Sequence, residues 1–61
     1  MTASEFAEAV SRALERASVR EIADGLGISH STVNRWAAGR SSPHPAMRGP
    51  VLKWFRGMGL L

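Results

Sequence analysis

The chain has 61 residues, a formal net charge of +3 and no cysteine. This length accommodates one domain, residues 1–61, and the lack of cysteine excludes disulfides and cysteine-based metal sites. No apolar run approaches the roughly 20 residues that cross a bilayer, and no signal-peptide pattern occurs, so we expect a soluble protein with no membrane partner.

Charge is divided unevenly along the sequence. The first 24 residues contain three basic and all five acidic residues, whereas the remaining 37 contain five basic residues and no acidic one. Such asymmetry indicates that the second part of the chain presents a surface for a polyanion. The alternative is a basic face that is only solvated. Seven of the eight basic residues are arginines, whose planar guanidinium suits phosphate and base edges and therefore favours the first interpretation.

The opening segment, residues 2–17, predicts an amphipathic helix. Phe6, Ala9, Val10 and Ala13 recur at helical spacing. Thr2, followed three residues later by a glutamate, forms a capping-box pattern that marks the helix start. We expect this helix to support the core rather than to bind a ligand.

Residues 19–38 predict two short helices joined by a tight turn. Ser18-Val19-Arg20-Glu21 is a second capping box, Gly27 can adopt the positive φ that a sharp turn needs, and Ser29 is a good N-cap for a helix of about residues 29–38. Gly39 suits the end of that helix. We expect the apolar side chains of this segment to face inward, namely Ile22, Leu26, Val33 and Trp36.

The last third of the chain predicts a loop and a final helix. Two prolines in residues 40–45 interrupt helix formation, and we expect at most one helical turn in residues 46–49. Pro50 suits the first position of a helix spanning about residues 50–58. The fold class is therefore all-α, a compact bundle of four to five short helices.

The spacing Ile22-Ala23-x-x-Leu26-Gly27-Ile28-x-x-x-x-Val33-x-x-Trp36 resembles the helix-turn-helix of Cro/C1-type (lambda repressor-like) proteins of phages and bacteria. The resemblance is strong over residues 19–38 and weaker elsewhere. It implies that the second helix enters the major groove of double-stranded DNA. It also implies a cytoplasmic location, in a bacterium or a phage-infected host. The pattern also occurs in helical bundles that do not bind DNA.

The resemblance implies two sets of contact residues. Base edges would be read from the start and outward face of the recognition helix, by Ser29, His30, Ser31, Asn34 and Arg35. Phosphates would be held by Arg20, Thr32, Arg40, Ser41, Ser42 and Arg48. Arginine can bind guanine through two hydrogen bonds, and asparagine can bind adenine in the same way. We expect Trp36 to be a core residue rather than a base-stacking group.

One recognition helix reads too few base pairs for useful specificity, so we expect a homodimer on a palindromic operator. The surplus apolar side chains near the C-terminus could form its interface, and they are Trp54, Met58, Leu60 and Leu61. The alternative is that Trp54 and Met58 complete the core of the monomer.

The sequence therefore predicts a DNA-binding regulator, most simply a repressor that acts by occupying its operator. No activated nucleophile, acid–base pair or phosphate-binding loop is evident, and His30 and His44 do not form a metal-binding pattern. We expect no enzymatic activity, cofactor, metal or small-molecule ligand. Two alternatives remain: a protein–protein module such as an antitoxin or adaptor, and a DNA-tethering part of a recombination or packaging system.

Overall fold

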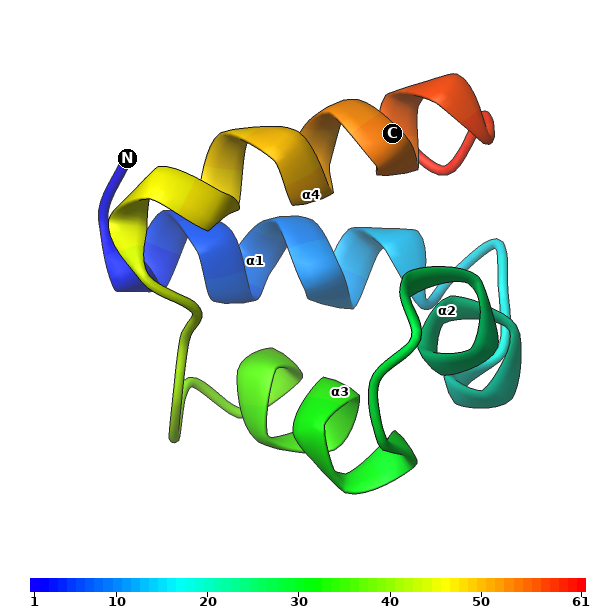
Figure 1. Ribbon diagram of the computed structural model, residues 1–61, viewed down its shortest axis with the longest axis horizontal. Helices are drawn as coiled ribbons and strands as arrows, with labels where there is room; N and C mark the ends of the chain where they lie inside the picture. Colours follow the sequence, from blue (N-terminus) through cyan, green and yellow to red (C-terminus); the bar gives the residue numbers. More distant parts are fainter.

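The computed structural model describes residues 1–61, and its regular structure consists of four α-helices. They are α1 (Ala3–Ala13), α2 (Val19–Leu26), α3 (His30–Ala37) and α4 (Pro45–Gly57). Helices α1 and α4 lie side by side and run in the same general direction, whereas α2 and α3 lie on the other side of α1 (Figure 1). The predicted all-α fold is confirmed. No helix is long and apolar enough to cross a membrane.

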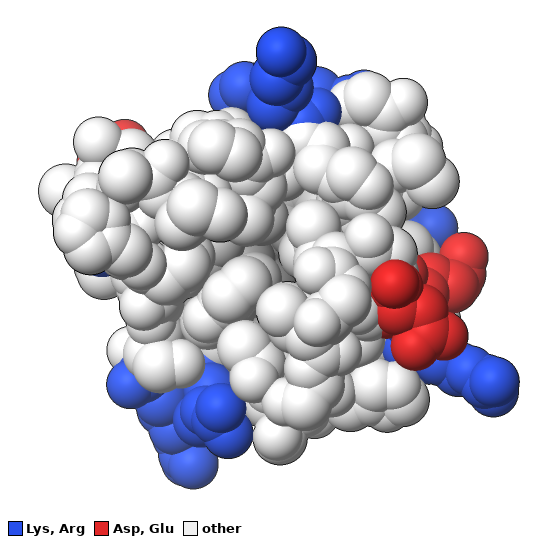
Figure 2. Space-filling view, viewed as in Figure 1, with Lys and Arg blue, Asp and Glu red and all other residues white.

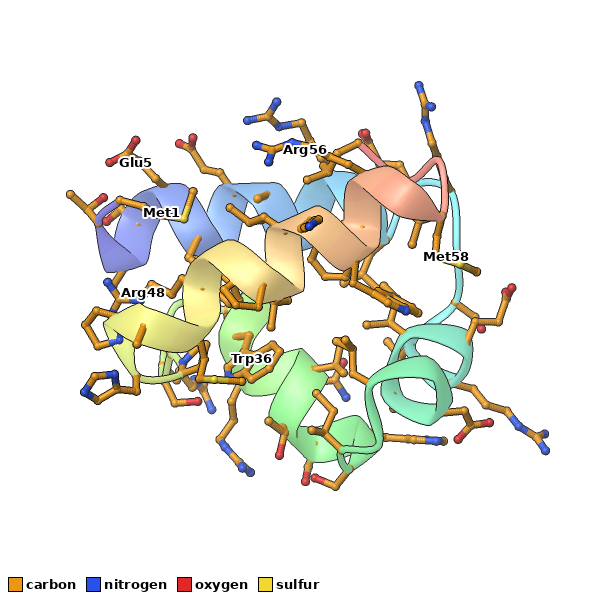
Figure 3. All side chains as sticks on the ribbon, turned by 45° about the horizontal axis from the view of Figure 1, so that its top comes forward. Met1, Glu5, Trp36, Arg48, Arg56 and Met58 are labelled. Carbon is orange, nitrogen blue, oxygen red and sulfur yellow. The ribbon has the colours of Figure 1, made fainter.

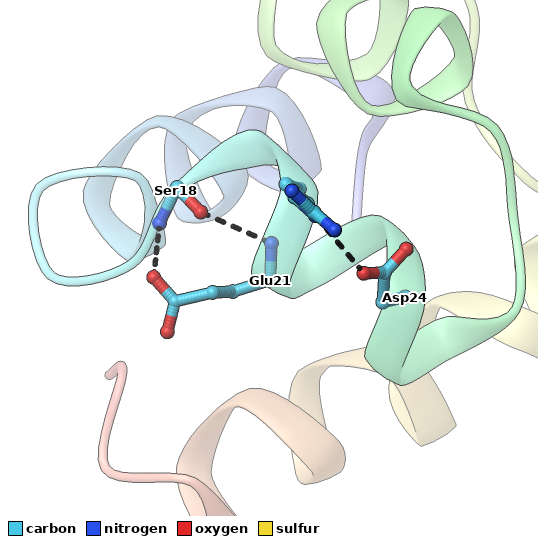
Figure 4. A network of polar contacts seen from close by, with 4 residues as sticks. Ser18, Glu21 and Asp24 are labelled. Carbon is cyan, nitrogen blue, oxygen red and sulfur yellow. Dashed lines mark hydrogen bonds and ion pairs between the residues drawn. The ribbon is translucent and has the colours of Figure 1, made fainter.

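The first three helices begin where the sequence predicts. The hydroxyls of Thr2, Ser18 and Ser29 each accept a hydrogen bond from the backbone N–H three residues later. At Thr2 and Ser18 the carboxylate of the glutamate three residues later accepts a hydrogen bond from the cap's own N–H, which completes both capping boxes (Figure 4 shows the second). These bonds satisfy amides that have no partner within the helix. Each helix start is therefore encoded within four residues.

Glycine determines how the two motif helices end. Gly27 adopts φ +70° after α2, and Gly39 adopts φ +72° after α3. Glycine has no Cβ and enters this left-handed region without strain. After α3 the N–H of Gly39 donates to Trp36 and the N–H of Arg40 donates to Arg35, the pattern of a Schellman motif. The predicted turn and helix end are both confirmed.

The core is formed where α1 packs against α3 on one side and α4 on the other. The ring of Phe6 meets the indole of Trp36 edge to face, with ring centroids 5.3 Å apart. Trp36 is 7% exposed, so its predicted place in the core is confirmed. Leu26 is only half-buried but packs against the same cluster. The eleven buried residues are Phe6, Ala9, Val10, Ala13, Ile22, Ala23, Val33, Trp36, Val51, Leu52 and Phe55.

The predicted start of the last helix at Pro50 is wrong. Helix α4 begins at Pro45, with the imidazole Nδ1 of His44 accepting a hydrogen bond from the N–H of Ala46, and Pro50 lies inside the helix. Proline normally disfavours helical geometry in the residue before it because its ring crowds that residue's Cβ. The preceding residue here is Gly49, which has no Cβ. The helix therefore continues through Pro50, and residues 46–49 belong to its first turn rather than to a separate helical turn.

The C-terminal residues are folded onto the body of the protein. A second Schellman motif, in which the N–H of Leu60 donates to the carbonyl of Phe55 over 2.8 Å, turns the chain after α4. Leu60 packs against the core, and the guanidinium of Arg16 donates to the carbonyl of Gly59. Trp54 is half-buried and also packs against the core. Met58 is 61% exposed and points away from α1 (Figure 3).

Candidate nucleic-acid interface

Helix α3 is anchored by its apolar side and presents its polar side to solvent. Val33 and Trp36 are buried against α1 and α2, which fixes the rotation of the helix about its axis. The five residues predicted to read bases are all exposed, and they are Ser29, His30, Ser31, Asn34 and Arg35. They lie at the N-terminal end and on the outward side of one helix. The structure therefore brings the predicted base-reading residues together on a single surface.

A short chain of hydrogen bonds links three polar side chains on α3. The Oγ of Ser29 lies 2.8 Å from the Oγ1 of Thr32, and the Nη2 of Arg35 donates to the same Oγ1 over 3.2 Å. Ser31 also approaches Ser29, with their hydroxyl oxygens 3.2 Å apart. Thr32, predicted to contact phosphate, thus already accepts a bond from Arg35. The structure shows a network here that the sequence analysis did not identify.

His30 and Asn34 are exposed, and their side chains form no hydrogen bond within the protein. Their donors and acceptors are satisfied by solvent alone in the free protein. Both side chains can therefore form bonds to another molecule without breaking an internal one, which removes one cost of binding.

Arg20 lies on the first turn of α2, beside a carboxylate. Its Nε is 3.7 Å from the Oδ2 of Asp24, and both side chains are largely exposed, 81% and 68% respectively (Figure 4). An exposed pair of this kind contributes about 0–1 kcal/mol and is screened by salt. The amide of Glu21 is already bonded to Ser18, and the Glu21 carboxylate sits at the same helix end. A phosphate contact here would therefore depend on the Arg20 guanidinium rather than on that amide.

The loop after α3 carries the second group of predicted phosphate contacts. Arg40 and Ser41 are exposed, whereas Ser42 is half-buried. The amide of Arg40 is held by the carbonyl of Arg35 at 2.9 Å, so the backbone enters the loop in a defined direction. Figure 2 shows basic side chains gathered over this part of the molecule, with no acidic side chain beside them on that face.

Arg48 has a structural role that the sequence analysis missed. Its Nε donates to the Oγ of Ser42 over 3.1 Å, and its Nη1 donates to the carbonyl of Met1 over 3.1 Å. Figure 3 shows Arg48 at the beginning of α4, near the N-terminal end of α1. The side chain thus ties the loop after α3 to the N-terminus. Two of its five N–H donors are therefore engaged within the protein.

The remaining charges occupy other parts of the surface. Acidic side chains gather near α2 (Figure 2), and Glu5 and Arg56 lie on the side formed by α1 and α4 (Figure 3). No acidic residue lies on α3 or on the loop that follows it. An open groove of about 500 Å³ lies on the surface where α1 meets the C-terminal end of α3, and its lining includes Ala7, Ala37 and Gly39. It lies away from the base-reading residues.

Comparison with known proteins supports the helix-turn-helix assignment. A family model described as a homeodomain-like domain matches residues 7–41, more than half of the chain, including the whole of α2 and α3. No curated protein and no solved structure matches the chain. The match is to a broad helix-turn-helix class and does not single out the Cro/C1 type. The chain therefore belongs to the homeodomain-like family of helix-turn-helix DNA-binding domains.

Proposed function

We propose that the protein is a sequence-specific regulator of transcription that binds double-stranded DNA with α3 in the major groove. The observation that carries this proposal is the exposed surface of α3, where hydroxyl, imidazole, amide and guanidinium groups stand together without any acidic residue. These groups match the donor and acceptor pattern of base edges. We also propose that α3 docks on DNA in the manner of Cro/C1-type proteins and that the protein is cytoplasmic.

Flanking contacts to phosphate would hold α3 in register. Arg40 and Ser41 lie immediately after the helix, and Arg20 lies at the start of α2. Contacts to phosphate position a protein on DNA without reading sequence, whereas contacts to base edges supply specificity. Repression by occupancy is the simplest outcome, because it requires only the DNA-binding surface itself.

We propose that the protein binds its operator as a homodimer, because a single α3 reaches few base pairs. Of the four residues expected at the interface, Trp54 and Leu60 pack against the monomer core. Met58 and Leu61 remain 61% and 38% exposed. Covering exposed apolar side chains of this size with a second subunit is favourable, because it removes apolar surface from water. The dimer proposal therefore now depends on Met58 and Leu61.

The direct test of function is selection of binding sites from a pool of randomised DNA duplexes. We expect enrichment of a palindrome whose half-sites lie about one helical turn, roughly 34 Å, apart. Affinity should fall steeply as salt concentration rises, because phosphate contacts release counterions. Failure to enrich any sequence would show that the protein is not a sequence-specific regulator. An interaction whose affinity does not change with salt concentration would instead favour an apolar protein–protein module.

Sedimentation of single-residue variants tests the dimer. Met58→Asp and Leu61→Asp should each shift the wild-type dimer toward monomer, because a charge at the subunit interface is costly to bury. Met47→Asp is the matched control, since Met47 is 53% exposed at the start of α4 and is not part of the proposed interface. A wild-type protein that stays monomeric on its selected palindrome would show that this interface is wrong.

A further inference from the structure

The side chain of Arg35 is held by a partner on its own helix. Its Nη2 donates to the Oγ1 of Thr32 over 3.2 Å, and that hydroxyl lies 2.8 Å from the Oγ of Ser29. Ser29 is itself fixed, because its Oγ accepts the backbone N–H of Thr32 over 3.2 Å as the N-cap of α3. The guanidinium is thus connected through two hydroxyls to the first turn of the helix.

The middle residue of this chain is well suited to hold a fixed position. Thr32 is half-buried, and a β-branched side chain has few χ1 rotamers in a helix. The Oγ1 of Thr32 accepts the bond from Arg35, so the hydroxyl proton of Thr32 is available to the Oγ of Ser29. Arg35 is exposed, forms no ion pair and has no other hydrogen bond from its side chain. The bond to Thr32 is therefore the one hydrogen bond that the Arg35 side chain forms within the protein.

We propose that Thr32 is a positioning residue that orients Arg35 toward the guanine it reads. This inference rests on the proposed function, and it assigns Thr32 a different role from the phosphate contact expected from the sequence. A guanidinium has five N–H donors. The bond to Thr32 uses one, and the remaining four are sufficient for the two bonds to guanine O6 and N7. A side chain ordered before binding loses less conformational entropy on binding.

Measurements on the free protein test the first half of the proposal without DNA. Nitrogen-15 relaxation at the Nε of Arg35 should report a more mobile side chain in Thr32→Val, which keeps the shape and removes the hydroxyl. Thr32→Ser keeps the hydroxyl and should stay closer to wild type. Thr32→Ala is a second hydroxyl-free variant, and thermal unfolding checks that each variant is folded. Equal order of Arg35 in wild type, Thr32→Val and Thr32→Ala would overturn the proposal.

Binding measurements test the second half, with the duplex that wild type selects and a copy in which the guanine assigned to Arg35 is replaced. Thr32→Val should reduce the preference for that guanine about 2- to 10-fold, the cost of ordering one long side chain. Binding to a scrambled duplex should change less than about twofold, since the phosphate contacts remain. Thr32→Ser should retain most of the preference.

Failure of this inference can be distinguished from failure of the proposed function. If wild type selects a sequence and Thr32→Val reads it with undiminished preference, Thr32 does not position Arg35. Equal losses in Thr32→Ser and Thr32→Val would also overturn the proposal, because the hydroxyl would then not be responsible. If wild type selects no sequence, the regulator function itself fails, and the positioning role of Thr32 in base reading fails with it.

Discussion

The indole of Trp54 lies directly against the backbone of Gly25, so that this side chain connects α4 to α2. A Cβ built on Gly25 would lie 2.3 Å from Cζ2 of that indole and 2.6 Å from Cη2. Both distances are far below van der Waals contact. The approach connects the C-terminal helix to the first helix of the helix-turn-helix motif, and it explains why Trp54 is half-buried in a monomer.

Gly25→Ala should destabilise the protein by about 1–2 kcal/mol, because the displaced indole costs more than the helix propensity that alanine gains. Gly57→Ala is the matched control: this residue is also helical, has no positive φ, and nothing lies within 4 Å of its added Cβ. The control should be neutral or slightly stabilising. Urea unfolding measures both, and a Gly25→Ala variant as stable as the control would contradict the close packing of Trp54 against Gly25.

Pro50→Ala should stabilise the protein by about 1–2 kcal/mol, because alanine supplies the N–H that proline lacks inside α4. Gly49→Ala should destabilise the wild type, since the new Cβ would crowd the Pro50 ring. The same Gly49→Ala change should become stabilising once Pro50 is alanine. A double-mutant cycle measured by thermal unfolding checks this reversal of sign. Equal effects of Gly49→Ala in both backgrounds would show that Gly49 does not accommodate the proline.

Arg48→Ala should lower the free energy of unfolding by about 1 kcal/mol, because the hydroxyl of Ser42 and the carbonyl of Met1 each lose a charged donor. Arg48→Lys should not restore the loss, since the donors of an ammonium sit on one nitrogen, whereas Arg48 reaches its two acceptors with two different nitrogens, Nε and Nη1. Urea unfolding without DNA is the measurement. Unchanged stability together with weaker DNA binding would instead assign Arg48 to phosphate contact alone.

Substitutions at Arg35 and Arg40 should affect DNA binding in different ways. Arg35→Ala should remove about 1–3 kcal/mol of discrimination at one base pair and leave weak nonspecific binding. Arg40→Ala should weaken binding to all sequences about equally and reduce the salt slope by roughly one unit. Titrations of selected and scrambled duplexes at several salt concentrations separate the two effects. Undiminished selectivity in Arg35→Ala would remove Arg35 from the set of base readers.

Acid should loosen the first turn of α1 through Glu5. The backbone N–H of Thr2, and secondarily its hydroxyl, hold the pKa of Glu5 below its ordinary value because they stabilise the charged carboxylate. The stabilisation is present above the ordinary pKa and is lost as pH falls through the lowered one. A carbon-13 NMR titration of the Glu5 carboxyl measures it. Thr2→Pro removes both donors and should return the pKa toward its ordinary value, whereas an unchanged pKa would rule out this cause.

Local features of the fold were predictable because they depend on residues close together in the sequence. Ser18 and Glu21 form a capping box three residues apart, and Gly27 supplies its positive φ without help from any distant group. The periodic apolar residues identified the buried sides of α1 and α3. Once Val33 and Trp36 are inside, helical geometry places Asn34 and Arg35 outside, so the exposure of the candidate base readers also followed from the sequence.

Tertiary structure alone decided the features that join distant parts of the chain. The contact between Trp54 and Gly25 spans 29 residues, and the bond from Arg48 to the Met1 carbonyl spans 47. The start of α4 was misjudged partly for a local reason, since Gly49 has no Cβ to crowd Pro50, and partly because the helix is held by the burial of Val51 and Phe55 in the core. Local hydrogen bonds and steric limits depend on neighbouring residues and can therefore be predicted from the sequence. The close approach of two helices depends on which side chains the whole fold brings together.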